Sequence, residues 1–187
     1  MTTPAIAVSP RSRARLAGVF YAITFVAGGF ALVAGGRSGF AAGLIAAASY
    51  IAVTVLFYYI FRPVNRSLSM LAALVSLAGC CIGPVSVALR LRVPANNIAL
   101  VFFGFYCLMI GYLILRSTFL PRFVGALMLF AALGWLTFLS PPLANYLYPY
   151  NLVPGLLGEG VLTLWLLIVG VDGQKWTEQA SAHGALG

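Results

Sequence analysis

The sequence predicts an all-α membrane protein, a polytopic bundle of about six transmembrane helices. Of its 187 residues, 62% are hydrophobic and 7% are charged, and the mean hydropathy is +1.02. A soluble domain has about 25% charged residues, so this chain has too little polar surface to cover a water-soluble globule. A helical span takes about 20 residues. Six spans and their connections therefore fill the chain and leave no room for a separate soluble domain.

Six apolar runs are separated by short polar or proline-containing segments. Apolar runs of this length must be helices, because lipid offers backbone N–H and C=O groups no other hydrogen-bond partner. A tyrosine-rich loop, with Tyr146, Tyr148 and Tyr150, precedes the last run. The predicted spans cover about residues 16–36, 40–61, 68–89, 98–115, 123–140 and 152–171.

The two ends of the chain are polar. Residues 1–15 form a basic segment with Arg11, Arg13 and Arg15 before the first apolar run. That run is longer than the roughly 7–15 apolar residues of a signal peptide, so we expect it to remain as the first span. Residues 172–187 are polar and rich in glycine and alanine, and we expect them to be a disordered tail.

The basic residues predict the orientation, because cytoplasmic loops of membrane proteins carry an excess of Lys and Arg. With the N-terminus inside, the inner segments hold eight basic residues and the outer segments hold three. Both termini are therefore expected in the cytoplasm, with residues 1–15 and the tail on that side. The outer three are Arg37, Arg90 and Arg92. We expect the cytoplasmic inner membrane of a bacterium as the location.

The net charge of +8 does not indicate a nucleic-acid partner. The basic residues are scattered in small groups between apolar runs, whereas nucleic-acid binding needs a basic face or patch. The expected partner of these charges is the lipid bilayer. The small-residue pairs Gly39 with Gly43 and Gly79 with Gly83 predict close helix packing, either within one bundle or in a homo-oligomer.

Missing residue types exclude many catalytic classes and predict neither a metal nor a cofactor. The only histidine, His183, lies in the tail, and no span holds two carboxylates. This argues against haem bound by histidines within the membrane, against zinc proteases and against aspartyl proteases. Cys80, Cys81 and Cys107 have neither a CxxC spacing nor the spacing of a metal site.

Glu159 is the one acidic residue within a predicted span. At 1.5 Å per residue it lies about 12 Å below the outer boundary, where a carboxylate costs about 2.5–3.5 kcal/mol on insertion scales. It must therefore face the bundle interior, pair with another group or stay protonated. The candidate partners of Glu159 are Thr163, Arg90, Arg92, Tyr21, Tyr50 and Tyr106. Together with Glu159, the same residues are the candidates for ligand binding. A structural link between helices and a functional site both remain open.

Several segments carry a family resemblance. They are the stretch from Phe102 to Arg122, the stretch from Gly158 to Val171, the opening residues 15–21 and the turn at residues 61–66. Over about residues 12–178 the chain resembles the bacterial "domain of unknown function 4386" family of multi-pass membrane proteins. The resemblance implies a membrane location and no established activity. It also matches Glu159 to a glutamate in the last span of that family.

Three functions fit these observations. The first is a non-catalytic bundle that binds a lipid, a small apolar ligand or a partner protein. The second is a small carrier or permease that uses Glu159. The third is an intramembrane enzyme on an isoprenoid or lipid substrate, with Glu159 as general acid. The lack of catalytic residue sets favours the first of these functions, in which the protein is not an enzyme.

Overall fold

The computed structural model describes residues 9–34, 36–89 and 95–184. Within these ranges the chain is helical, with no strand. Two 3-10 turns, at Thr137–Leu139 and Tyr150–Leu152, flank the short helix α6. The α-helices are α1 (Pro10–Ala34), α2 (Gly36–Phe61), α3 (Arg66–Ala88), α4 (Ala95–Arg116), α5 (Arg122–Leu136), α6 (Pro141–Leu147), α7 (Val153–Ile168) and α8 (Gly173–Gly184).

The predicted fold class is confirmed: the described residues form six helices that are long and apolar enough to cross a membrane. These candidate spans are Pro10–Ala31, Gly36–Phe61, Arg66–Gly83, Asn97–Arg116, Arg122–Leu139 and Tyr150–Ile168. The first helix begins at Pro10, before the predicted start at residue 16, and it therefore includes the three arginines of the basic segment. Long basic side chains can reach the headgroup region from the end of a span, so they do not stop the helix.

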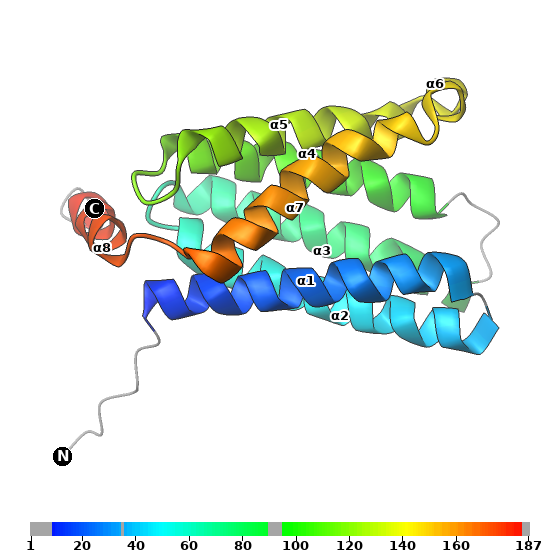
Figure 1. The fold of residues 1–187 in the computed structure, drawn as a ribbon, viewed down its shortest axis with the longest axis horizontal. Helices are drawn as coiled ribbons and strands as arrows, with labels where there is room; N and C mark the ends of the chain where they lie inside the picture. The colour runs from blue at the N-terminus through cyan, green and yellow to red at the C-terminus, as the bar shows by residue number, and fades with distance from the viewer. Residues whose placement is uncertain (1–8, 35, 90–94, 185–187) are drawn as a thin grey trace, which may run out of the picture.

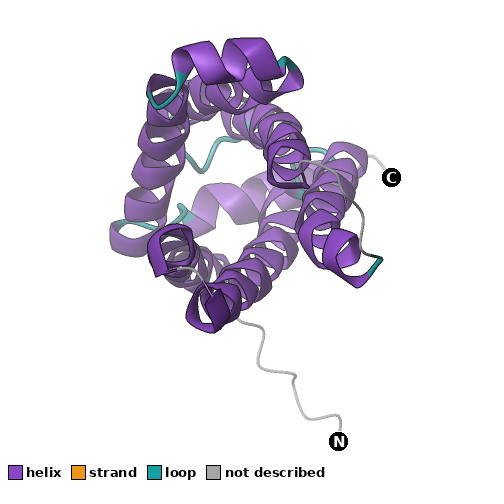
Figure 2. Cartoon of the chain, turned by 90° about the vertical axis from the view of Figure 1, so that its right-hand side faces the viewer, coloured by secondary structure: helices purple, strands orange, loops and turns teal. Residues whose placement is uncertain are grey.

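The six long helices form a ring. Each packs against its neighbours in the sequence, and α7 packs against both α5 and α1, which closes the ring. Figure 2 looks along the bundle and shows this arrangement end-on. The start of α1 and the whole of α8 lie at the same end of the bundle, and α6 lies at the other end (Figure 1). The two ends of the described chain therefore share one side, as an even number of spans requires.

Glycines bring some of these helices into close contact. A Cβ atom at Gly111 of α4 would lie 3.0 Å from the carbonyl oxygen of Gly125 in α5. A Cβ atom at Gly125 would lie 2.9 Å from the carbonyl oxygen of Gly111. A Cβ at Gly79 of α3 would lie 3.1 Å from the Cβ of Phe102 in α4. Lipid provides no hydrophobic drive between helices, so packing of this kind has to hold them together.

The tyrosine-rich connection between the fifth and sixth spans contains the short helix α6, where the sequence predicts a loop. Proline is tolerated in the first turn of a helix because the N–H it lacks would have no partner there, and α6 begins at Pro141. Tyr146, Tyr148 and Tyr150 are exposed. They lie at the α6 end of the bundle, where aromatic side chains can meet lipid headgroups.

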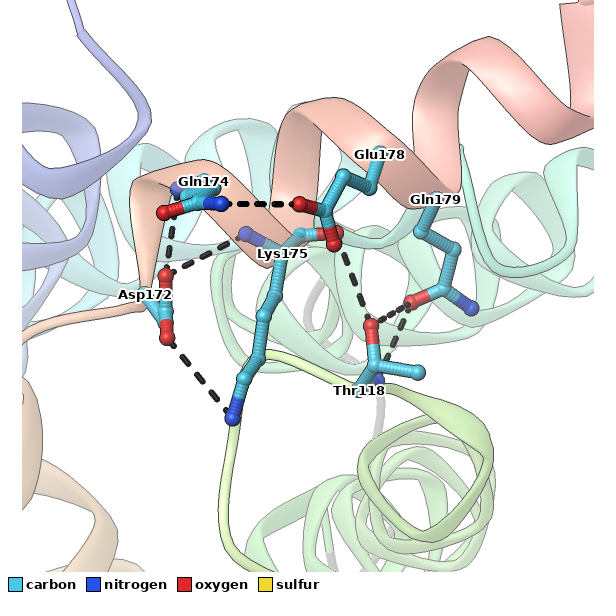
Figure 3. A network of polar contacts seen from close by, with 6 residues as sticks. All are labelled: Thr118, Asp172, Gln174, Lys175, Glu178 and Gln179. Carbon is cyan, nitrogen blue, oxygen red and sulfur yellow. Dashed lines mark hydrogen bonds and ion pairs between the residues drawn. The ribbon is translucent and has the colours of Figure 1, made fainter.

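The prediction of a disordered tail is wrong for residues 173–184, which form α8. Asp172 caps this helix, because its Oδ1 atom accepts hydrogen bonds from the N–H groups of Gln174 at 3.1 Å and Lys175 at 3.2 Å (Figure 3). Gln179 accepts two hydrogen bonds from Thr118 in the turn between α4 and α5. The indole N–H of Trp176 donates to the carbonyl of Ile60 at 2.8 Å. The Asp172 cap and these long-range contacts keep this polar segment helical, although its composition alone predicts disorder.

Removing the Trp176 donor should loosen α8 without unfolding the bundle. We expect Trp176→Phe to speed amide hydrogen exchange of residues 173–184 roughly twofold to tenfold, because a net hydrogen bond contributes about 0.5–1.5 kcal/mol. Hydrogen exchange of the purified protein in detergent measures this.

Glu178→Gln is the matched control, since residue 178 is exposed and glutamine keeps the oxygen that accepts from Gln174. Equal exchange rates in α8 of the two variants would show that the Trp176 contact does not hold the helix.

Candidate functional site

Glu159 lies buried inside the ring, with 6% of its surface exposed. Its Oε2 atom accepts a hydrogen bond of 2.6 Å from the hydroxyl of Tyr21 in α1. Its Oε1 atom accepts one of 2.6 Å from the indole N–H of Trp135 in α5 and a longer one of 3.7 Å from the thiol of Cys107 in α4. The carboxyl group on α7 is therefore joined to three other helices.

Both carboxyl oxygens therefore have hydrogen-bond partners. Within the described ranges the one salt bridge joins Lys175 to Asp172, outside the ring, and Glu159 forms none. The cationic partners expected from the sequence, Arg90 and Arg92, lie outside the described residues.

Two glycines of α7 fix the surroundings of Glu159. A Cβ at Gly155 would overlap the indole ring of Trp135, and a Cβ at Gly158 would overlap the carbonyl of Leu127 in α5. Glycine at these positions therefore lets α7 approach α5 closely enough for the Trp135 indole to reach Glu159. Gly160, on the other side of Glu159, has no neighbouring atom within 4 Å of its Cβ position.

The structure brings four of the predicted candidates together. Tyr21 donates to the Glu159 carboxyl group, and Thr163 donates at 2.7 Å to the Glu159 backbone carbonyl one turn earlier. The ring of Tyr50 packs edge-on against Tyr21 at 5.6 Å and against Tyr106 at 5.9 Å, between ring centroids. The Tyr50 and Tyr106 rings thus lie beside the Glu159 contacts.

Sequence reasoning missed Trp135 and Cys107 as contacts of Glu159. Trp135 carried a usable signal, because an indole N–H inside a span is a donor that needs an acceptor. Cys107 carried none, since a buried thiol in a span is as well explained by packing.

A cavity of about 420 Å³ lies inside the ring, on the α6 side of Glu159. All six long helices line it, mainly through the parts nearer α6. Its walls are mainly apolar and include the rings of Phe25, Phe103 and Trp135. Glu159, Tyr21 and Tyr50 are also among its lining residues.

The hydroxyl of Tyr50 is an unusual polar group near this cavity. Tyr50 is 5% exposed, and its hydroxyl has no hydrogen-bond partner among the described residues. A buried polar group without a partner costs about 1–3 kcal/mol. Tyr50 lines the cavity, whereas its hydroxyl oxygen is covered by neighbouring atoms.

Part of the chain is similar to a family of unknown function. Residues 85–170 match the family described as "Domain of unknown function (DUF4386)". The chain resembles the DUF4386 family. The predicted resemblance is therefore confirmed, and the matched segment of this DUF4386-like chain contains Cys107, Trp135 and Glu159.

One curated relative is described as an uncharacterized protein from Archaeoglobus fulgidus. It is 26% identical to this chain over 136 residues, which are 70% of this chain and 81% of the relative. No solved structure matches the chain.

Two buried tyrosines provide a matched test of the hydrogen bond to Glu159. Tyr21 and Tyr106 are both 1% exposed, but the Tyr21 hydroxyl donates to Glu159 whereas the Tyr106 hydroxyl has no partner among the described residues. We expect Tyr21→Phe to lower the free energy of unfolding by about 1–2 kcal/mol. Tyr106→Phe should leave it unchanged or raise it. Unfolding by SDS in mixed micelles measures both, and a similar loss in the two variants would contradict this assignment.

Two glycines of α7 test the close contact with α5. Gly158→Ala should lower the melting temperature in detergent, because overpacking against the Leu127 carbonyl costs about 1–3 kcal/mol. Gly160→Ala is the control and should be neutral or stabilising, since its Cβ meets open space and alanine favours a helix by about 1 kcal/mol over glycine. Equal melting temperatures for the two variants would mean that α7 and α5 are not in close contact.

Proposed function

We propose that this protein is a non-catalytic membrane bundle that binds a small, largely apolar ligand in the cavity beside Glu159. The observation that carries the proposal is a mainly apolar cavity of the ring, lined by the buried Glu159 and by the aromatic residues Tyr50 and Trp135. Ligand sites are typically concave, mostly apolar and supplied with a few converging polar groups. The cavity volume of about 420 Å³ falls in the usual range for small-molecule sites.

The hydrogen bonds of Glu159 favour binding over catalysis. Its carboxyl group accepts bonds from Tyr21, Trp135 and Cys107, which fix its position. A general acid must be able to give its proton to a substrate, whereas both oxygens of this carboxyl group are already bound to protein groups. The carboxyl group is thus suited to hold a bound polar group in a constant place.

The expected setting is the cytoplasmic membrane of a bacterium, with both termini in the cytoplasm. The excess of basic residues on the side that carries α8 and the start of α1 supports this orientation. In that orientation the cavity lies in the outer half of the bilayer, and a ligand would reach it from the outer leaflet or from outside the cell.

Neighbouring alanines of α2 provide a matched test. Ala47 lines the cavity, whereas Ala48 lies on the exposed face of the same helix. We expect native mass spectrometry of gently solubilised wild type to show a bound small molecule. Ala47→Phe, which fills the cavity, should lose that molecule, and Ala48→Phe should retain it.

Retention of the molecule by Ala47→Phe would place its binding elsewhere. A protein free of any bound small molecule in the wild type and in both variants would argue against the proposed function and in favour of a purely structural role for Glu159.

A further inference from the structure

We infer that the ligand is a lipophilic organic cation, whose charge is balanced by Glu159 and whose apolar body fills the cavity. This inference rests on the proposed function and names the chemical class of its ligand. It follows from two features of the cavity: a buried carboxyl group whose partners among the described residues are neutral, and aromatic walls.

The first feature is the carboxyl group of Glu159. The side chain lines the cavity and is 6% exposed, and its described partners are the neutral groups Tyr21, Trp135 and Cys107. Hydrogen bonds from neutral groups satisfy the lone pairs of an ionised carboxylate but do not balance its negative charge. Because charges interact strongly in a medium of low dielectric constant, a cation would favour the ionised form of Glu159 and be bound tightly, whereas an anion would be repelled.

The second feature is the aromatic lining. Tyr21, Phe25, Tyr50, Phe103 and Trp135 all face the cavity. Tyr50 and Phe103 are in direct contact, with ring centroids 4.8 Å apart. The negative face of an aromatic ring attracts an organic cation, and the attraction is stronger when both groups are desolvated. The same rings also cover the apolar part of such a ligand.

A neutral apolar molecule would fill the volume but would leave an ionised Glu159 without a counterion. A cation matches the carboxylate and the aromatic walls at once.

A pair of ions of the same shape and opposite charge tests this inference on the wild-type protein. We would measure the binding of radiolabelled tetraphenylphosphonium and of tetraphenylborate by equilibrium dialysis in detergent, with protein-free micelles as the blank. Tetraphenylphosphonium should bind saturably at one site, and at least tenfold more tightly than tetraphenylborate. Ala47→Phe should abolish this binding, and Ala48→Phe should not.

Glu159→Gln removes the charge and keeps an oxygen that can accept from Tyr21 or Trp135. We expect it to weaken tetraphenylphosphonium binding at least tenfold without weakening that of tetraphenylborate. Glu159→Asp, which retains the charge, should bind the phosphonium ion more tightly than Glu159→Gln does. If Glu159→Gln does not fold, the comparison of the two ions on the wild type still decides the question.

The outcomes separate this inference from the proposed function. Equal binding of both ions, lost in Ala47→Phe, would overturn the cation inference and leave the cavity as an apolar ligand site. Binding of neither ion to a wild type that retains a bound molecule in native mass spectrometry would also overturn the cation inference alone. Phosphonium binding that survives in Ala47→Phe would place the cation outside this cavity and overturn the inference.

Discussion

Two short hydrogen bonds to the Glu159 carboxyl group, from Tyr21 and Trp135, join α7 to both of its neighbours in the ring. α1 and α7 are far apart in the sequence, and their contact is the one that closes a ring otherwise built from successive helices. A carboxylate within a span is costly to insert, and these donors offset part of that cost. The same contacts place the carboxyl group on the wall of the cavity, so closure of the ring and chemistry of the site depend on one residue.

The rest of the packing allows those hydrogen bonds to form. In lipid, helices associate through close van der Waals contact and polar bonds. Gly155 and Gly158 leave the α7 face that meets α5 without side chains at these positions. Gly111 and Gly125 do the same where α4 meets α5. These contacts bring α4, α5 and α7 close enough for Trp135 and Cys107 to reach Glu159. Towards the α6 end, the six helices instead surround the apolar cavity.

Features that depend on local sequence could be predicted, whereas features that depend on contacts between distant residues could not. The spans follow from local composition, and a lone acid in a span demanded a buried partner, which made Tyr21 a predictable donor. The helix α8 could not be predicted, because its order depends on distant contacts of Trp176 with Ile60 and of Gln179 with Thr118. The role of Trp135 likewise depends on the distance between α5 and α7, which glycines set in three dimensions.

The surroundings of the protein bear on why a charge would be placed in an apolar cavity. The bilayer offers neutral acyl chains at a very high concentration, and any apolar space that they can reach is open to them. Shape and apolar surface alone would therefore give a ligand little advantage over lipid, since selectivity is a difference between two affinities. A buried carboxylate with aromatic walls creates that difference, because an organic cation gains the electrostatic energy that an acyl chain cannot. In this interpretation the cost of burying Glu159 is what makes the site selective.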